Sequence, residues 1–461
     1  MKKKSKLLSL IVAVAMVIPM ISFAAPSENA LKAFDQKIIN KVDANKALEH
    51  ITYLSETIGP RVAGTEEEEV AANYIKNQFE SYGYDVEVQD FEIDNVVSKL
   101  TVENLENVLF RVNTATGSGY TDKNGINVQL VDCGYGATEA DFPKEVNGKI
   151  AFVQRGEVSF AQKAENAENT GAIAVIMYNN TKGNLNPTLG DYKANIPYLS
   201  ISLEDGDKIK SEMEKSKVNV SIESRHLTSS QNIIATRKPK KVENTEIVYV
   251  TAHYDSVPYA PGANDNASGT SMLLELAKIL KSYPIDKEIR FIACGAEEIG
   301  LDGSTYYVSQ LSKDEISRSC ANFNMDMIAT SYESCDILYL DTINGEENLV
   351  TESMAAAGYR LDNDVLAIGK GSSSDHAPFG RAGVPSACFI WGDENGNLEE
   401  YYHTPNDTIA KNISKERLQQ VGELVGAALY DVVRKDTPHI ERSAIRNAIP
   451  VDKQYGLNIT K

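Results

Sequence analysis

Strands and helices alternate through the second half of this chain, and that alternation constrains the fold more than any other feature. Expected strands fall at residues 247–252, 289–293, 321–325, 337–340 and 386–390, and expected helices at 268–282, 304–311 and 414–433. Such a pattern predicts an α/β domain with a largely parallel sheet and helices on both faces. Functional residues of these domains gather where strands end and loops begin.

Residues 113–228 have a different pattern. Turn residues open the segment, and short strands are expected at 128–131, 149–153, 172–177 and 218–222, with helical periodicity at 159–170 and 203–214. Histidines and carboxylates show no ligand-like spacing there. The segment is therefore expected to form a β-rich module without chemistry of its own. Before it, Thr65 and Glu68 predict a capping box, with a helix to about Tyr82 and a strand at 84–91.

The N-terminus has the composition of a secretory signal peptide. Four lysines stand within residues 1–6, an apolar run covers residues 7–23, and Ser22 and Ala24 are the small residues before the expected cleavage site. We therefore predict a signal peptide at residues 1–24, secretion, and no stable membrane insertion after cleavage. An uncleaved anchor is the alternative, because the run is about long enough to span a bilayer. The tail, residues 437–461, receives no assignment.

Charge and cysteine content exclude other classes. The 461 residues carry 46 Lys and Arg against 65 Asp and Glu, a formal net charge of -19. That charge repels phosphate backbones, so nucleic acid is not expected as a partner. The five cysteines include no Cys-x-x-Cys pair, which argues against a disulfide framework or a structural zinc knuckle. One or two disulfides remain open.

Residues that can bind metals follow several of the predicted strands. Taken singly, each has an ordinary structural explanation, such as a helix cap or a solvated loop. Together they provide two imidazoles and three carboxylates, a mixture that suits zinc or a similar divalent ion. The set comprises His253, Asp265, Glu298, Asp326 and His403.

Five ligands exceed the needs of one tetrahedral zinc with an open position. If Asp265 bridges, the set fits two ions about 3.5 to 4 Å apart, each with two further ligands. Asp255, two residues after His253, can orient that imidazole. Of the adjacent Glu297 and Glu298, one can bind a metal while the other takes a proton from metal-bound water.

These stretches resemble the secreted two-zinc aminopeptidase family of the aminopeptidase S and Y type, over about residues 232–408. The resemblance implies that His253 and Asp326 hold one zinc, that Glu298 and His403 hold the other, and that Asp265 bridges. It also implies that Glu297 is the general base, that Asp255 supports His253, and that Tyr402 helps to polarise the scissile carbonyl.

The Ser-Asp-His-x-Pro-Phe stretch of that family is present at residues 374–379. Some relatives carry an Arg immediately before it, where this chain has Ser373, which bears on substrate recognition. We expect His376, within the stretch, to be structural or to support a metal ligand without binding the metal itself.

The insertion resembles a protease-associated (PA) domain. The match is carried by residues 152–160, Lys163-Ala164, Gly171-Ala172 and Ile196-Pro197. The two resemblances together imply a three-layer peptidase domain with a mostly parallel mixed sheet over residues 30–112 and 229–436, and a β-rich PA domain inserted at residues 113–228.

The expected function is that of a secreted aminopeptidase with two Zn²⁺ ions, acting on peptides with a free N-terminus. A metallo-carboxypeptidase or amidase on the same core is the nearest rival, and it needs a basic receptor for the substrate carboxylate. No compact basic cluster lies near the motifs. The sequence also leaves open a glutaminyl cyclase-like transferase and a non-catalytic secreted peptide-binding protein.

Overall fold

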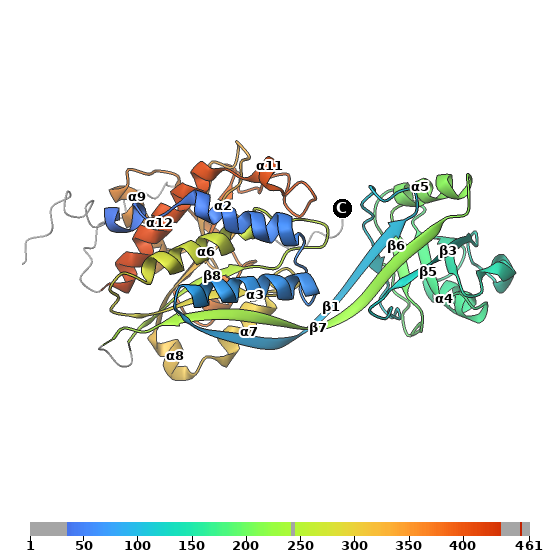
Figure 1. The fold of residues 1–461 in the computed structure, drawn as a ribbon, viewed down its shortest axis with the longest axis horizontal. Coiled ribbons are helices and arrows are strands. Elements are labelled where there is room, and N and C mark those ends of the chain that lie inside the picture. The colour runs from blue at the N-terminus through green and yellow to red at the C-terminus, as the bar shows by residue number, and fades with distance from the viewer. Residues whose placement is uncertain (1–34, 241–244, 435–451, 454–461) are drawn as a thin grey trace, which may run out of the picture.

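Two lobes joined by a long two-stranded arm make up the molecule (Figure 1). The computed structural model describes residues 35–240, 245–434 and 452–453. The arm consists of β1 (Asp85–Val102) and β7 (Asn219–Arg237), which pair antiparallel with a register shift between Glu92 and Asn95. We call residues 95–227 the small lobe and the other described residues the large lobe. The predicted signal peptide and most of the tail lie outside the described residues.

The large lobe is built on a mostly parallel mixed sheet. Its strand order is β14-β12-β11-β13-β10-β8-β9-β7, and β7 and the β11–β13 pair supply the antiparallel contacts. The bounds are β8 Ile247–His253, β9 Glu288–Cys294, β10 Ser319–Met325, β11 Ile337–Thr342, β12 Leu366–Gly371, β13 Ser386–Gly392 and β14 Asp452–Lys453. The tail thus returns to the edge of the sheet at β14, beside β12.

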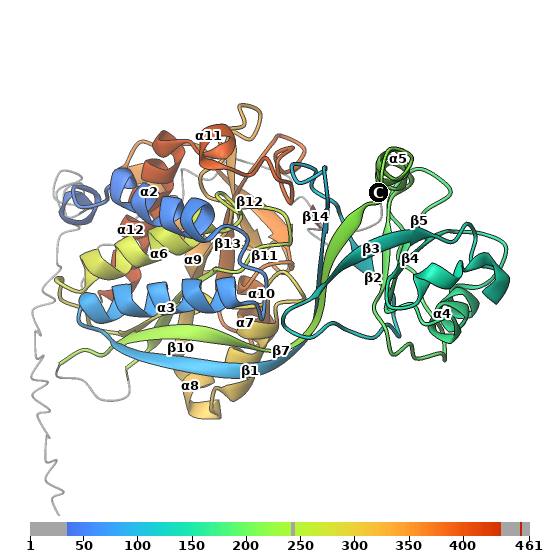
Figure 2. The ribbon, with the colours of Figure 1, turned by 45° about the vertical axis from the view of Figure 1, so that its right-hand side comes forward.

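Helices cover both faces of this sheet (Figure 2). One face carries α2 (Ala44–Thr52), α3 (Glu66–Ser81), α6 (Ala267–Leu280), α9 (Leu349–Arg360) and α12 (Lys415–Val433), and α2 continues into a π-helical turn, Tyr53–Ile58. The other face packs against α7 (Asp302–Gln310) and α10 (His376–Arg381). Shorter helices are α8 (Lys313–Arg318) and α11 (Ile409–Asn412). No helix among the described residues combines the length and apolar composition needed to cross a bilayer.

Alternation along the strands explains why both faces are covered. In β8, Val248 and Val250 belong to the core under α6, whereas Ile247 and Tyr249 belong to the core under α7 and α10. A strand buried on both faces reads as a continuous apolar run, as in other α/β sheets. The predicted α/β class, with helices on both faces of a mostly parallel sheet, is confirmed.

The capping prediction at α3 is half right. Thr65 accepts from the backbone N–H of Glu68, as a helix cap should. The Glu68 carboxylate, however, accepts from the N–H of Gly64 and from the hydroxyl of Ser230 rather than from Thr65. The physical reason is that Glu68 is buried against β7, where Ser230 offers a tertiary donor.

The small lobe contains a second sheet and few helices, as predicted. Its elements are β2 (Asn113–Thr114), β3 (Ile126–Asp132), β4 (Ile150–Gln154), β5 (Ala174–Tyr178), β6 (Tyr198–Ile201), α4 (Phe160–Asn169), α5 (Leu203–Met213) and two 3-10 turns, Glu139–Asp141 and Lys144–Val146. Separate apolar cores lie on the two faces of this sheet. The strands expected at 84–91 and 218–222 are parts of the much longer β1 and β7, so residue 228 lies inside a continuous strand.

Candidate metal centre

The predicted ligands meet at one edge of the large-lobe sheet. His253 is the last residue of β8, Asp326 directly follows β10, and Glu298 lies four residues after β9. Strands β9, β8 and β10 are parallel neighbours, so their carboxyl ends lie side by side. Asp265 comes from the loop before α6, and His403 from the loop between β13 and α11. All five side chains converge.

Asp265 occupies the middle of the cluster. Its Oδ1 lies 3.4 Å from Nε2 of His253, and its Oδ2 lies 3.1 Å from Nε2 of His403. Beyond the histidines, Asp326 Oδ1 is 3.3 Å from His253 Nε2, and Glu298 Oε2 is 3.0 Å from His403 Nε2. The two oxygens of one carboxylate therefore face two different imidazoles.

The donor set fits divalent cations. Ligand atoms around a tetrahedral zinc, at about 2.0 to 2.1 Å from it, lie about 3.3 to 3.4 Å from one another, which is close to the observed separations. His403 Nε2 is buried beside two carboxylate oxygens yet has no hydrogen-bond partner, and Glu298 Oε1 has none either. Atoms that are close together without being directed at each other suit ligation of a common ion.

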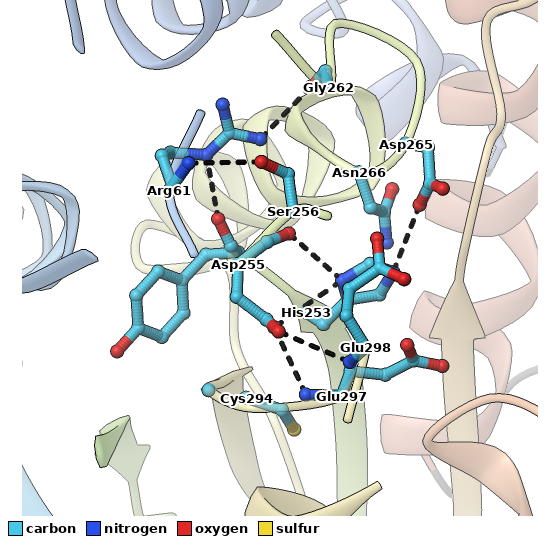
Figure 3. Close-up of polar contacts among 12 residues, drawn as sticks. Arg61, His253, Asp255, Ser256, Gly262, Asp265, Asn266, Cys294, Glu297 and Glu298 are labelled. Atoms are coloured by element: carbon cyan, nitrogen blue, oxygen red, sulfur yellow. Dashed lines mark hydrogen bonds and ion pairs between the residues drawn. The ribbon is translucent and has the colours of Figure 1, made fainter. Parts of the chain in front are cut away.

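Two carboxylates beside the cluster have different surroundings. Glu297 is buried and has a carboxylate oxygen within 4.8 Å of ligand atoms of His253 and Asp326. Asp255 accepts from the backbone N–H groups of Glu297 and Glu298 at 3.1 and 3.2 Å, and its Oδ1 lies 3.6 Å from His253 Nδ1 (Figure 3). Asp255 thereby links the β8 end to the loop that carries both glutamates.

Burial sets the protonation of the cluster when no cation is bound. It raises the pKa of Glu298 to about 7, with Asp265 adding to the effect, and it raises the pKa of Glu297 well above its usual range. Burial opposes a charged His403, but Glu298 and Asp265 outweigh it and raise the pKa of that imidazole to about 10. The cluster concentrates negative charge that protons or metal ions must balance.

Residues outside the predicted set hold the ligand loops. Asp407 accepts from the backbone N–H groups of Asn264 and Asp265 at 2.9 and 3.0 Å. Asn266 donates to the Met325 carbonyl, which ties the start of α6 to the end of β10. These contacts fix Asp265 relative to Asp326.

The Ser-Asp-His stretch contributes a hydrogen bond to one of the proposed ligands. Ser374 donates to Asp326 Oδ2 at 2.8 Å and accepts from Asn324 at 2.8 Å. His376 is fully buried, and its Nε2 lies 2.9 Å from the Gly371 carbonyl oxygen. Ser374 therefore contacts the cluster, whereas His376 bonds to the backbone.

Arg61 is the largest feature that the sequence did not reveal. Its fully buried guanidinium donates to the carbonyls of Tyr254, Pro261 and Gly262, and also to those of Leu54 and Gly59. Figure 3 shows the bond from Arg61 to Gly262. These bonds shape the loop between His253 and Asp265. Carbonyl acceptors carry no residue signature, so only the Gly59-Pro60-Arg61 turn could have drawn notice.

A cavity of about 230 Å³ opens onto the cluster. Its walls combine the site residues with apolar side chains, among them Leu301, Met327, Ile390 and Leu398. The third predicted catalytic residue, Tyr402, also lines the cavity, and its ring stacks on that of His403 with the centroids 3.7 Å apart. Seven of the eight predicted site residues therefore line one cavity, and the eighth, Asp255, lies behind the ring of His253.

Comparisons with known proteins point to one family. The sequence profile of Peptidase family M28 matches residues 232–429, and the PA domain profile matches residues 126–209. Aminopeptidase YwaD of Bacillus subtilis is 44% identical over 414 residues, which cover 89% of this chain and 90% of that protein.

Solved structures agree with the sequence matches. BSAP, a zinc aminopeptidase from Bacillus subtilis, superposes with a TM-score of 0.62 at 44% identity, covering 87% of this chain and 98% of that one. An aminopeptidase from Aneurinibacillus sp. strain AM-1 gives a TM-score of 0.58 at 38% identity, covering 91% and 100% of the two chains. The chain, with its inserted PA domain, belongs to peptidase family M28.

Proposed function

We propose that this protein is a secreted aminopeptidase that holds two zinc ions and removes N-terminal residues from peptides. Similarity to a zinc aminopeptidase over most of both chains supports the metal and the reaction. The observation that carries the count of two is the position of Asp265, whose two oxygens face different histidines at 3.4 and 3.1 Å.

Each ion has its own protein ligands in this proposal. His253 and Asp326 hold one zinc, Glu298 and His403 hold the other, and Asp265 bridges them. A pair of ions also accounts for the concentration of buried carboxylates, because burying several negative charges without cations is costly.

Each residue around the ions has a separate role in hydrolysis. Zinc, when bound, polarises a carbonyl oxygen and lowers the pKa of a water molecule. Glu297 is the proposed base that takes the proton of the attacking water and delivers it to the leaving amine. Asp255 keeps the His253 ring and the two glutamate N–H groups in place. Tyr402, in the cavity wall, is the proposed donor to the carbonyl oxygen as it gains charge.

The charge of the cavity favours a free amine. Carboxylates surround the cavity, and Lys and Arg are absent from its described lining. A protonated substrate amine gains from these carboxylates, whereas an N-terminal Asp or Glu side chain would be repelled. The apolar wall of Leu301, Met327, Ile390 and Leu398 suits an uncharged first side chain.

Secretion is the part of the proposal that rests on the N-terminus alone. The lysines within residues 1–6 and the apolar run to residue 23 support export and cleavage after Ala24. N-terminal sequencing of protein from the culture medium should begin at Ala25. Cell-bound protein that still carries residues 1–24 would favour the uncleaved anchor instead.

One comparison of substrates tests the reaction. A leucyl peptide and its N-acetylated form are incubated with the protein, before and after removal of metal by a chelator. The proposal expects release of leucine from the free peptide only, loss of that release after chelation, and recovery with zinc. Equal cleavage of the acetylated peptide would argue for an amidase or carboxypeptidase, and full activity of the metal-free protein would refute metal dependence.

A further inference from the structure

An arginine from the small lobe lies beside the metal centre. Arg111 Nη2 donates to the main-chain carbonyl of His403 at 3.4 Å, although 292 residues separate the two in sequence. The side chain of Arg111 is exposed, and this is its only hydrogen bond within the described chain. In Figure 2 the segment that leaves β1 runs between the two lobes, next to the loop that precedes α11.

The backbone that carries Arg111 is held firmly. Its neighbours Phe110 and Val112 are both buried, while Leu109 and Arg111 are exposed, so these two side chains share one face. Tyr259 accepts from the Val112 N–H at 3.0 Å and donates to the Ser98 carbonyl at 3.3 Å. Tyr259 belongs to the loop between His253 and Asp265, so the base of Arg111 is fixed relative to the proposed zinc ligands.

Arg111 introduces a positive charge beside an acidic cavity. The described lining of the cavity contains carboxylates and no Lys or Arg, whereas Arg111 offers unpaired guanidinium N–H groups next to it. A guanidinium binds a carboxylate in a planar, bidentate manner. A ligand with an amine at one end and a carboxylate at the other matches this separation of charge.

The position of Arg111, bonded to a residue of the cavity lining, suits a short peptide. An extended chain advances roughly 3.3 to 3.6 Å per residue, so two or three residues span roughly 7 to 10 Å. His403, itself a proposed ligand, connects Arg111 to the cluster. Its imidazole faces Asp265, and its main-chain carbonyl accepts from Arg111.

We infer that Arg111 binds the C-terminal carboxylate of dipeptide or tripeptide substrates whose amine lies at the metal centre, and so makes short peptides with a free carboxylate preferred substrates. The inference rests on the proposed aminopeptidase function. It assigns the segment between β1 and the small lobe a role in substrate selection, with exposed Leu109 on the same face as an apolar contact for the last side chain.

The test compares two substrates that differ only at the C-terminus, leucylglycine and leucylglycinamide. For the wild type, kcat/KM should be higher for the acid than for the amide. In Arg111→Gln the ratio of the two kcat/KM values should fall by about 5- to 10-fold, chiefly through KM for the acid, as expected for one charge-assisted contact at a partly exposed site. Arg111→Lys should recover part of the ratio, because it keeps the charge without the bidentate geometry.

Arg381 provides a matched control. It is also exposed, and its Nη2 donates at 3.4 Å to the carbonyl of Ser372, another residue of the cavity lining. Arg381 is the last residue of the short helix α10 and belongs to the large lobe. Arg381→Gln makes the same change of charge at a comparable position and should leave the ratio close to that of the wild type.

Three outcomes would overturn the inference. These are an unchanged ratio in Arg111→Gln, a loss of the ratio in Arg381→Gln instead, or an equal loss on acid and amide, which would mean that Arg111 only supports the His403 loop. Failure of the wild type on both substrates would refute the aminopeptidase function itself. The two failures are therefore distinguishable.

Discussion

At the scale of single residues, adjacent side chains in this site have different surroundings. Glu298 faces His403 at 3.0 Å, whereas Glu297 lies near His253 and Asp326. The backbone N–H groups of both glutamates donate to Asp255, which fixes the loop that carries them relative to the end of β8. Their proposed roles, base and ligand, can be separated by matched substitutions.

Glu297→Gln should keep both zinc ions and lower kcat by about 10² to 10⁴-fold, the usual contribution of a general base. Glu298→Gln should lose zinc, because an amide oxygen is a weaker ligand than a carboxylate. Zinc content and kcat of both variants decide the matter. The assignments are exchanged if Glu297→Gln loses metal and Glu298→Gln retains it.

His50, which lies away from the site, makes the stability of the fold depend on pH. Its ring is buried, with Nδ1 2.6 Å from the hydroxyl of Tyr74, and burial together with the charge of Lys278 lowers its pKa to about 4. The unfolded chain binds a proton near pH 6.5, so the stability contributed by neutral His50 is present above that pH and is lost as pH falls towards 4.

The wild type should therefore lose about 2 kcal/mol more unfolding free energy than His50→Gln between pH 7 and pH 4.5. Denaturant unfolding of the two proteins at both pH values measures the difference. An identical pH dependence would show that His50 does not titrate in this way.

The residue types of the site could be predicted because metal ligands are few in kind and because His253, Glu298 and Asp326 come at or just after the end of a strand. His253, Asp265, Glu298, Asp326 and His403 all lie where the sequence pattern expected loops. Arg61, Asp407 and Ser374 could not be predicted as supports. Their partners are backbone groups or distant side chains, and the pairing depends on tertiary structure.

At the scale of elements, strands β8, β9 and β10 and helices α6, α7 and α12 match their predicted ranges to within two residues. Their apolar periodicity and capping residues are strong local signals. Helix α9 was not predicted, because most of its own residues are apolar or small and are buried. Its sequence therefore lacks the polar stripe that marks an amphipathic helix. The lengths of β1 and β7 were underestimated, because much of β1 is exposed and polar.

The close contact between α6 and β10 predicts that Gly269 cannot be replaced by a larger residue without loss of stability. A Cβ on Gly269 would collide with the Met325 carbonyl oxygen, a backbone atom next to Asp326. Gly269→Ala should cost about 2 to 3 kcal/mol of stability and weaken zinc binding, because α6 or β10 must move. Thermal unfolding and zinc affinity measure both effects.

Gly426→Ala in α12 is the control. Its Cβ would meet only side-chain carbons, the nearest at 3.0 Å, and alanine favours a helix over glycine. This variant should stay within about 1 kcal/mol of the wild type and bind zinc normally. If Gly269→Ala behaves like Gly426→Ala, tight packing at α6 does not limit the position.

At the scale of the whole molecule, the arm determines how the lobes can be separated. Residues Asn95–Val102 of β1 pair with Val220–Leu227 of β7 in the small lobe, and Asp85–Glu92 pair with Ser229–Thr236 in the large lobe. Removing residues 113–228, as the sequence pattern suggests, would leave the outer part of β1 without its partner. Its buried Leu100 and Val102 would then be exposed.

Removing the small lobe at the register shift between β1 and β7 should give a more soluble protein. Removing residues 95–227 and closing the gap with a short glycine linker keeps the inner halves of β1 and β7 paired as a hairpin. We expect this shorter chain to be soluble and to bind zinc, and the chain lacking residues 113–228 to aggregate. Size-exclusion chromatography and zinc content compare them. Equal solubility of both would show that the outer arm does not matter for folding.

The central claim is a pair of zinc ions bridged by Asp265, and the number of zinc ions bound per chain at saturation tests it most directly. Metal analysis of the wild type, Asp265→Ala and His253→Ala after zinc loading and gel filtration gives that number. We expect two ions in the wild type, one in His253→Ala, and fewer than one in Asp265→Ala, because the bridge serves both ions and offsets their repulsion. A single ion in the wild type, or equal loss of one ion in both variants, would contradict the claim.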